Sequence, residues 1–384
     1  MVSTRLHNSL LTRRHLLVAG LGLPLCAGTV QGQTDSSAAM SSPLVKRPLQ
    51  FPHDLGSHPD TAIEWWYVTG ELQAADRRFG FQLTFFRSRV PSTQSMQSAF
   101  AAKQLIFAHA AVTDVAGKRL LHDQRIARSS GVPGVDLAHA SDADTDVQLR
   151  DWSLVRLSNH YQARANGSDF AFELALQETQ PLMLQGDQGL SRKGPQPEQA
   201  SFYYSLPQLA VTGDLTLAGK AMAVTGRAWL DHEWSQSIMP PQAVGWDWIG
   251  MNLNDGSALT AFRLRDKAGG TVWAGGSWRA PGVALPVVFG PDQVVFTPER
   301  FWKSAASGTT YPVQWSVDVP AGPAGANIAQ RFTVRTVIDN QELDSSRSTE
   351  AIYWEGLSEL LDAQGQPVGQ GYLEMTGYAK PLSL

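Results

Sequence analysis

Two short segments of the chain place carboxylates directly beside tryptophans. Residues 64–67 read EWWY and residues 231–234 read DHEW. Tryptophan is usually packed in a core, whereas aspartate and glutamate are rarely buried without a partner. Each segment is therefore either the end of an ordinary strand with solvated acids, or half of one shared site. We expect the two segments to lie close together, because an acid beside an aromatic ring is costly to bury alone.

The second segment offers two different chemistries, depending on which side faces inward. In a strand, residues two apart share a face, so Asp231 lies with Glu233, and His232 lies with Trp234. If His232 and Trp234 face inward, an imidazole beside an aromatic plane could protonate a substrate or stabilise a cation. If Asp231 and Glu233 face inward, like charges meet and one carboxyl gains a raised pKa, which would make it an acid.

The first segment divides in the same way and supplies candidate ligand-binding groups. Glu64 and Trp66 share one face of the predicted strand, and Trp65 and Tyr67 share the other. Further along, Tyr203 and Tyr204 are neighbours on opposite faces, so only one of them can line a cavity, and we select Tyr204 as a ligand-binding candidate.

A second cluster raises the question of a metal. His53, Asp54 and His58 fall within six residues, and histidine with aspartate suits zinc. Their spacing matches no standard closed site, and Pro52 and Gly56 indicate a loop. We therefore predict no metal and no cofactor. His109 lies in an apolar run, where a histidine is most often a hydrogen-bonded core residue.

The start of the chain predicts export. Residues 1–32 contain three arginines and no acidic residue, followed by a short apolar run and a small-residue ending, which is typical of a secretory signal. The Arg13–Arg14 pair favours the twin-arginine route, with a Sec signal as the alternative. Lipidation at Cys26 is disfavoured because Leu25 is large. We predict a periplasmic or secreted protein, with residues 33–46 as a flexible tether.

Composition excludes several classes of function. The formal net charge is −4, and it becomes three units more negative once the leader arginines are removed. An acidic chain without a basic block is a poor nucleic-acid binder. No later apolar run approaches the length of a membrane span, so the mature protein is not predicted to be integral to a membrane. Cys26 is the only cysteine, so stability must come from a core rather than from disulfides.

The body of the chain predicts β-structure throughout. Many short runs alternate apolar and polar residues and are joined by turn signals, such as Asn254-Asp255-Gly256 and Ala218-Gly219-Lys220. No helical pattern is sustained over 12 residues after the leader; residues 349–365 come nearest and also suit a strand. Such a pattern predicts barrels or sandwiches. A break at Pro240-Pro241 suggests two β-domains, over residues 47–235 and 243–384.

Five motifs, in order along the chain, carry a family resemblance. They are IEWWYVTGEL, FYYSLPQLAVTGDL, VTGRAWLDHEWS, GWDWIGMNLNDGSALTAFRLR and GYLEMTGY. The chain resembles, over roughly residues 50–380, the two-domain lipocalin-like family that includes the AttH-like proteins and the carotenoid 1,2-hydratases. The resemblance implies an all-β fold of two lipocalin-like (calycin-type) antiparallel barrels, with a ligand region near their interface. The label of secreted hydrolase used for some relatives finds no support, since the chain lacks a G-x-S-x-G motif.

The hydratase branch of that family implies a particular set of catalytic groups. Its members add water to an isoprenoid double bond, which calls for an acid and for aromatic groups that stabilise a carbocation. The matching candidates here are His232 with Trp234, and Asp247; Trp246 and Trp248 flank Asp247 and are candidate ligand-binding groups. From the strand pattern above, Asp231 is a further catalytic candidate and Glu233 a further ligand-binding candidate. Carotenoid hydration itself fits poorly with an exported chain.

Two functions therefore stay open at the level of sequence. The first is an exported protein that binds a hydrophobic, isoprenoid or lipid-like ligand. The second is a cofactor-free hydratase or lyase acting on such a molecule. The carboxylates distinguish them, because a pure carrier has little use for acids in its cavity. Glu64, Asp231 or Asp247 facing a cavity would favour the enzyme, and pairing with arginines would favour a structural role.

Overall fold

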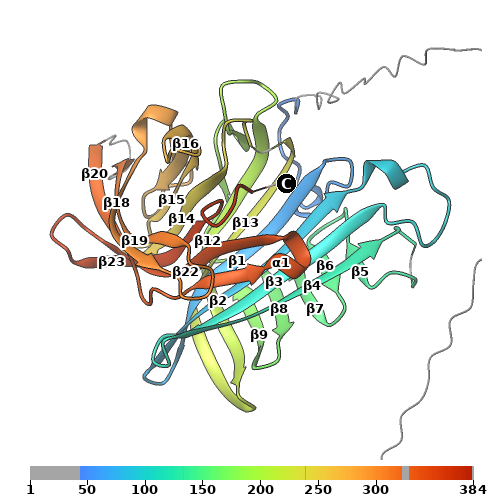
Figure 1. Ribbon diagram of the computed structural model, residues 1–384, viewed down its shortest axis with the longest axis horizontal. Coiled ribbons are helices and arrows are strands. Elements are labelled where there is room, and N and C mark those ends of the chain that lie inside the picture. Colours follow the sequence, from blue (N-terminus) through green and yellow to red (C-terminus); the bar gives the residue numbers. More distant parts are fainter. Residues whose placement is uncertain (1–43, 133, 238, 322–327, 383–384) are drawn as a thin grey trace, which may run out of the picture. The chain divides into compact units, whose positions relative to one another are not determined.

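The computed structural model describes residues 44–132, 134–237, 239–321 and 328–382, and Figure 1 shows their course. The predicted leader, and all but the last three residues of the predicted tether, lie outside the described residues. The described residues fold almost entirely into two antiparallel sheets. This confirms the prediction of an all-β chain with two lipocalin-like halves.

The first sheet runs in the order β4-β3-β2-β1-β13-β12-β9-β8-β7-β6-β5, with β10 and β11 paired to β12. Its end strands come into contact, because β4 touches β5 and β6, so the sheet curls into a nearly closed barrel. Its strands are β1 (Ile63–Ala74), β2 (Arg77–Arg89), β3 (Gln104–Asp114), β4 (Arg119–Ser129), β5 (Ala138–Ala140), β6 (Asp146–Leu149), β7 (Trp152–Leu157), β8 (His160–Asn166), β9 (Phe170–Gln177), β10 (Met183–Leu184), β11 (Leu190–Arg192), β12 (Ala200–Leu217) and β13 (Lys220–Ser237).

The second sheet runs in the order β17-β16-β15-β14-β23-β22-β20-β19-β18, with β21 paired to β22. Its strands are β14 (Gly245–Leu253), β15 (Ala258–Arg265), β16 (Thr271–Arg279), β17 (Val287–Phe289), β18 (Val295–Lys303), β19 (Thr310–Ala321), β20 (Ile328–Thr336), β21 (Glu342–Ser345), β22 (Ala351–Leu361) and β23 (Pro367–Met375). Strand β13 and strand β14 follow each other in the chain but belong to different sheets.

Both turn signals read from the sequence form hairpins. Ala218 and Gly219 join β12 to β13 with φ values of 48° and 77°, the doubly positive pair that matches the twist of the flanking strands. Gly256 lies between β14 and β15 with φ of 90°, where glycine avoids the steric cost of a side chain. The segment with the nearest approach to a helical pattern is strand β22.

Helices are few and short in the described part of the chain. They are η1 (His53–Leu55), η2 (Pro91–Thr93), η3 (Pro291–Gln293) and α1 (Ser346–Thr349). None of them has the length and apolar character needed to cross a lipid bilayer.

Each sheet encloses its own core, and a third apolar cluster joins the two sheets. The joining cluster includes Tyr67 and Trp229 from the first sheet and Trp248, Phe262 and Tyr372 from the second. Buried side chains of this size each stabilise the fold by roughly 1.5–3 kcal/mol. The two sheets are therefore held together by apolar packing, and the residues at this junction are fixed well enough to form a site.

Candidate functional site

The two tryptophan–acid segments are direct neighbours in the first sheet. Strand β1 pairs with β13 so that Glu64 lies opposite Trp234, and Tyr67 lies opposite Asp231. Their proximity agrees with the sequence-based expectation. The two faces of this strand pair, however, point to different places: the even-numbered face of β1 turns toward the core of the first sheet, and the odd-numbered face turns toward the second sheet.

A pocket of about 660 Å³ lies on the odd-numbered face, between the two sheets. Six of the residues selected from the sequence line it, namely Trp65, Tyr67, Asp231, Glu233, Trp246 and Trp248. All six come from β1, β13 or β14. The pocket is thus formed where the sequence places acids beside aromatic rings, but only by alternate residues of each segment.

The floor of the pocket consists of two rows that cross the first sheet. One row is largely aromatic and runs through Tyr203, Glu233, Trp65, Phe86 and Phe107, which lie opposite one another on successive strands. Neighbouring strands are about 4.8 Å apart, so this row extends roughly 19 Å. A floor of that length suits an elongated apolar molecule.

The second row is polar and carries Asp231. Its pocket-lining residues are Asp231, Tyr67, Thr84 and His109, again opposite one another on successive strands, and Ser205 continues the row outside the pocket. Polar and aromatic groups therefore run side by side along the pocket floor. A ligand lying along the aromatic row would have polar groups beside it from β13 to β3.

Asp231 is buried and held by three donors. Ser205 Oγ and Trp229 Nε1 donate to its Oδ1 at 2.5 and 2.7 Å, and the Tyr203 hydroxyl donates to its Oδ2 at 2.7 Å. Burial raises the pKa of the Asp231 carboxyl to about 7, even though these hydrogen bonds favour its charged form. The same Tyr203 hydroxyl accepts a hydrogen bond from Trp248 Nε1 at 3.2 Å, which links the two sheets at this point.

Glu233 lies two residues further along β13 on the same face and, unlike Asp231, is paired with a lysine. Lys193 Nζ lies 2.9 Å from its Oε1, and the Ser201 hydroxyl donates to the same oxygen. The Lys193 ammonium also lies over the rings of Tyr203 and Phe262, at 4.8 and 4.3 Å from their centroids. Glu233 therefore lies in a cluster with Lys193 and Ser201 whose geometry suits orientation of a ligand.

Two buried carboxyls in the pocket were missed by the sequence analysis. Glu355 of β22 and Glu374 of β23 lie directly opposite each other and both line the pocket. Burial, reinforced for Glu355 by the neighbouring Glu374 charge, raises the pKa of Glu355 well above its ordinary value. Burial also raises the pKa of Glu374, to about 7. The signal was present in the sequence, because Trp354-Glu355 repeats the acid-beside-tryptophan pattern of the first segment.

At the β3 end of the polar row, His109 lines the pocket together with Tyr353 and Ser348. His109 Nδ1 lies 2.9 Å from the Tyr353 hydroxyl, and its Nε2 lies 2.9 Å from Ser348 Oγ. Burial lowers the pKa of His109 to about 3, so its ring is neutral near pH 7. The interpretation of His109 as a hydrogen-bonded core histidine fits these contacts, but its position at the pocket wall was not foreseen.

The remaining candidates of the two segments lie outside the pocket. Glu64, Trp66, His232 and Trp234 are buried on the opposite face of β1 and β13, together with Tyr204. Burial lowers the pKa of His232 to about 4, although its hydrogen bond to Glu64 acts in the other direction. The structure thus places Tyr203, not Tyr204, in the pocket. The reason is the pairing register: on β12, Tyr203 lies opposite Glu233 and shares its face, whereas Tyr204 lies opposite His232 and shares the other face.

Asp247 also faces away from the pocket. Its Oδ2 lies 2.7 Å from Arg263 Nε and 3.1 Å from Arg265 Nε, and its Oδ1 accepts a hydrogen bond from the Tyr378 hydroxyl at 2.9 Å. Its neighbours Trp246 and Trp248 face the pocket. Such pairing with two arginines is the arrangement that we expected of a structural carboxylate.

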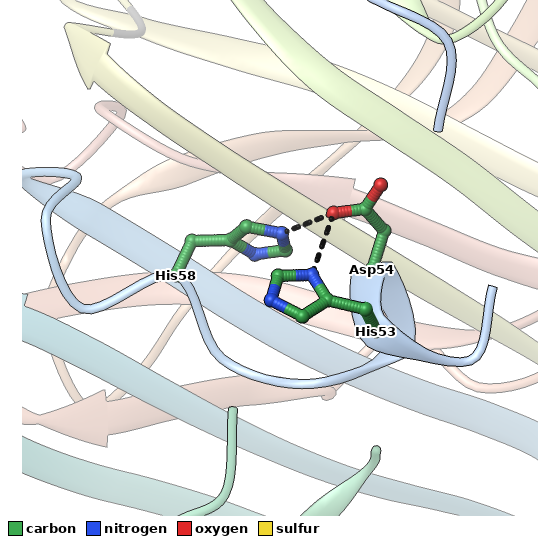
Figure 2. A group of neighbouring side chains, drawn as sticks. All are labelled: His53, Asp54 and His58. Carbon is green, nitrogen blue, oxygen red and sulfur yellow. Dashed lines mark hydrogen bonds and ion pairs between the residues drawn. The ribbon is translucent and has the colours of Figure 1, made fainter. Parts of the chain in front are cut away.

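The loop before β1 forms a separate polar cluster, shown in part in Figure 2. Asp54 Oδ1 lies 3.3 Å from His53 Nδ1 and 3.0 Å from His58 Nε2. Arg47 donates to both oxygens of the same carboxylate, at 2.6 and 2.7 Å. Asp54 and His58 are largely buried, whereas the side chain of His53 is 64% exposed. The cluster lies on the even-numbered side of β1, behind the floor of the pocket.

Comparisons with known proteins agree with the fold and identify the family. The model of the AttH-like family matches residues 42–378. The crystal structure of an AttH protein from Nitrosomonas europaea is 44% identical, with a TM-score of 0.79, and the match covers 88% of this chain and 99% of that one. Among curated proteins, none matches the sequence.

Two more distant structures share the fold. Kievitone hydratase from Nectria haematococca is 17% identical with a TM-score of 0.62, over 86% of this chain and 91% of that one. CghA, solved with Sch210972, is 12% identical with a TM-score of 0.50, over 87% of this chain and 96% of that one. The family resemblance read from the five sequence motifs is confirmed by the family match and by the Nitrosomonas structure, and the chain belongs to the AttH-like family.

Proposed function

We propose that the chain binds an elongated apolar small molecule in the pocket between the sheets and adds water to it by proton transfer, as a hydratase does. The observation that carries this proposal is the opposed pair of Glu355 and Glu374, which face the pocket with raised pKa values. Two carboxyls this close in an apolar wall do not both ionise, so one keeps a proton near neutral pH. A carrier gains nothing from such a group.

The pocket contains what hydration of a double bond needs. The protonated member of the pair donates its proton to one alkene carbon, which leaves a carbocation on the other. The ring faces of Trp65 and Trp246, which line the same pocket, stabilise that cation. Water then forms the new C–O bond, and its surplus proton passes to a carboxylate, for which Asp231 is placed in the polar row. The acid donates one proton and a base receives one, so the reaction is balanced.

Distant relatives support the class of substrate. Kievitone hydratase is named for hydration of a small molecule, and CghA was solved with the small molecule Sch210972. Both share the fold with this chain. A small apolar substrate is also what the aromatic floor of the pocket fits.

An exported carrier of a hydrophobic ligand is the second candidate, and the apolar lining of the pocket is the observation in its favour. Incubation in H₂¹⁸O with a panel of prenylated and other isoprenoid compounds separates the two functions. We expect one substrate to gain the mass of one ¹⁸O-labelled water, as measured by mass spectrometry. Retention of a compound without any gain of mass would support the carrier.

The acid pair provides the matched variants for this experiment. Glu374→Gln and Glu355→Gln keep the side-chain size and remove the transferable proton, so we expect turnover to fall by at least about 100-fold while ligand retention persists. Glu173→Gln, at an exposed position of β9, should leave turnover unchanged. Full turnover in both pocket variants would overturn the proposal.

We propose further that the protein works outside the cytoplasm. The support is the leader read from residues 1–32, with its Arg13–Arg14 pair.

A further inference from the structure

Three potential metal ligands lie close together on the face of β1 and β13 that turns away from the pocket, toward the core of the first sheet. Glu64 Oε1 lies 2.7 Å from His58 Nδ1 and 2.9 Å from His232 Nε2. The three donor atoms all lie within 4.8 Å of one another. They come from the loop before β1, from β1 and from β13, so the fold, and not local sequence spacing, brings them together.

Both ring nitrogens of His58 face carboxylate oxygens, although a neutral imidazole has only one N–H to donate. Its Nδ1 faces Glu64 Oε1, and its Nε2 faces Asp54 Oδ1 at 3.0 Å. A neutral imidazole carries a single N–H, so only one of these two carboxylates can receive a hydrogen bond from it. The other contact needs either a second ring proton or another cation between nitrogen and oxygen.

Each of the three residues His58, Glu64 and His232 also contacts a second polar group on the side away from the other two. Asp54 contacts the far nitrogen of His58, and the Tyr204 hydroxyl contacts the far nitrogen of His232 at 2.9 Å. Metal-binding histidines are typically oriented in this way by an outer carboxylate or hydroxyl, which fixes the tautomer and directs the free lone pair to the ion.

Glu64 shows the same division between an outer and an inner side. Its Oε2 accepts hydrogen bonds from Arg87 Nε at 2.7 Å and from Ser57 Oγ at 2.9 Å. The contacts of both histidine rings are made to Oε1, and the backbone N–H of His58 donates to both oxygens, at 3.1 Å to Oε1 and 2.9 Å to Oε2. The arginine therefore fixes one oxygen of the carboxylate, and the other is directed toward the two imidazoles.

Stacking fixes the orientation of both rings. The His58 ring lies parallel to Trp234, with centroids 3.8 Å apart and an interplanar angle of 6°, and the His232 ring stacks on Trp66 at 4.7 Å and 19°. Glu64 and His232 are fully buried, and only 10% of the His58 side chain is exposed. Ligands held in this way lose little freedom on binding an ion.

We propose that His58, Glu64 and His232 bind a divalent transition-metal ion, with Zn²⁺ as the best match. Two imidazoles and one carboxylate form an established zinc ligand set. The ion would fasten the loop that carries His58 to the two strands behind the pocket floor. This site is separate from the proposed hydratase chemistry and does not depend on it.

The neighbouring triad of His53, Asp54 and His58 is the competing site, and the contacts argue against it. Both oxygens of Asp54 are engaged by Arg47, and the backbone N–H of Gln50 also donates to Oδ2 at 2.5 Å. His53 is mostly exposed and approaches Asp54 only at 3.3 Å (Figure 2). His53 therefore supplies a matched control, because it is an additional histidine of the same loop that is excluded from the proposed ligand set.

The test uses the mature protein without a polyhistidine tag. The protein is stripped with EDTA, dialysed and titrated with ZnCl₂, and bound zinc is counted by native mass spectrometry and elemental analysis. We expect one Zn²⁺ per chain. His58→Ala should weaken zinc binding by at least about 100-fold, whereas His53→Ala should change it by no more than about twofold.

A second measurement covers the case in which His58→Ala fails to fold. Co²⁺ added to the stripped wild-type protein should give the visible d–d bands of a low-symmetry site of four or five ligands, and one equivalent of ZnCl₂ should abolish them. The proposal is overturned if the wild-type protein takes up no stoichiometric zinc, which would show a network held by protons alone. Equal loss of binding in His53→Ala would overturn it in favour of the outer triad. Neither result affects the pocket, since no readout involves turnover.

Discussion

Glu355 and Glu374 show how the surroundings of a glutamate shift its pKa. Both lie in strands with an ordinary alternating pattern, but the strands are paired so that the two glutamates lie opposite each other in the apolar wall of the pocket. Glu359, four residues further along the same face of β22, instead pairs with Arg335 at 2.9 Å and has a lowered pKa, because hydrogen bonds from the arginines outweigh its partial burial. Counter-charge, and not residue type, separates the two glutamates with raised pKa values from the one with a lowered pKa.

The raised pKa values predict an unusual dependence of stability on pH. Burial raises the pKa of Glu374 from 4.5 to about 7 in the folded state. The folded protein therefore binds the proton more tightly than the unfolded chain does. The resulting stability is complete below about pH 4.5 and is lost as the pH rises through about 7.

Glu374→Gln should remove this dependence. We expect the variant to melt close to the wild-type temperature near pH 5 and above it near pH 8, as measured by circular dichroism across the pH range. Glu173→Gln serves as the surface control and should follow the wild type. A constant difference in melting temperature between Glu374→Gln and wild type at every pH would contradict the assigned shift.

At this scale the sequence predicts the parity of each strand but not the direction in which each face turns. The pairs Asp231 with Glu233 and His232 with Trp234 followed from the period of two. Which pair faces the pocket depends on where the second sheet packs, and no local pattern encodes that. Asp247 could not be separated from the pocket for the same reason, since its arginine partners lie on another strand.

At the scale of the strand, the pocket floor depends on the close approach of β1 and β13. Gly226 of β13 lies opposite Leu72 of β1. A Cβ atom at Gly226 would lie 1.9 Å from the carbonyl oxygen of Glu71. The backbones therefore approach at a distance that only glycine allows, and hairpin signals alone do not reveal such contacts.

Gly226→Ala should push the two strands apart and lower the free energy of unfolding by roughly 1–3 kcal/mol, as overpacking does in cores. Urea denaturation measures this loss. The exposed neighbour Thr225→Ala should stay within about 0.5 kcal/mol of wild type. Equal stability of the Gly226 and Thr225 variants would show that the strands can separate without cost.

At the scale of the whole molecule, the two sheets share contacts that neither could satisfy alone. Gln208 Nε2 of β12 donates to the backbone oxygens of Leu253 and Ser257, each at 2.9 Å, and Arg279 of β16 donates to the backbone oxygen of Pro181 at 2.5 Å. The all-β class and the turn-joined hairpins were predictable from alternation and turn residues. These contacts were not, because they join segments that are far apart in the sequence.

Shared packing predicts one cooperative unfolding transition for residues 44–382. Tryptophan fluorescence and far-ultraviolet circular dichroism should give the same denaturant midpoint, because the joining cluster is lost together with both cores. The matched comparison is Trp248→Phe, which trims that cluster and should lower both midpoints together. Two separate transitions would show that residues 47–235 and 243–384 fold independently.

The proposal that the protein works outside the cytoplasm is tested on the full-length chain. Replacing Arg13 and Arg14 by lysine should leave uncleaved precursor in the cytoplasm, because the twin-arginine route recognises the guanidinium pair. Cell fractionation and immunoblotting measure the distribution, with Arg5→Lys as the control. Unchanged export of the double variant would assign the leader to the Sec route.

The opposite faces of β1 and β13 have a consequence for how descendants of this gene can diverge. Alternate residues within 64–67 and 231–234 have different roles: one set packs in the buried core of the first sheet, and the other set lines the pocket. Point substitutions at Trp65, which lines the pocket, are therefore expected to alter the proposed ligand preference with less effect on the buried framework than substitutions at Trp66. A deletion of one codon has the opposite effect, because it would exchange the two faces over the whole strand at once. Saturation mutagenesis of β1 should consequently show tolerance that rises and falls with every second residue.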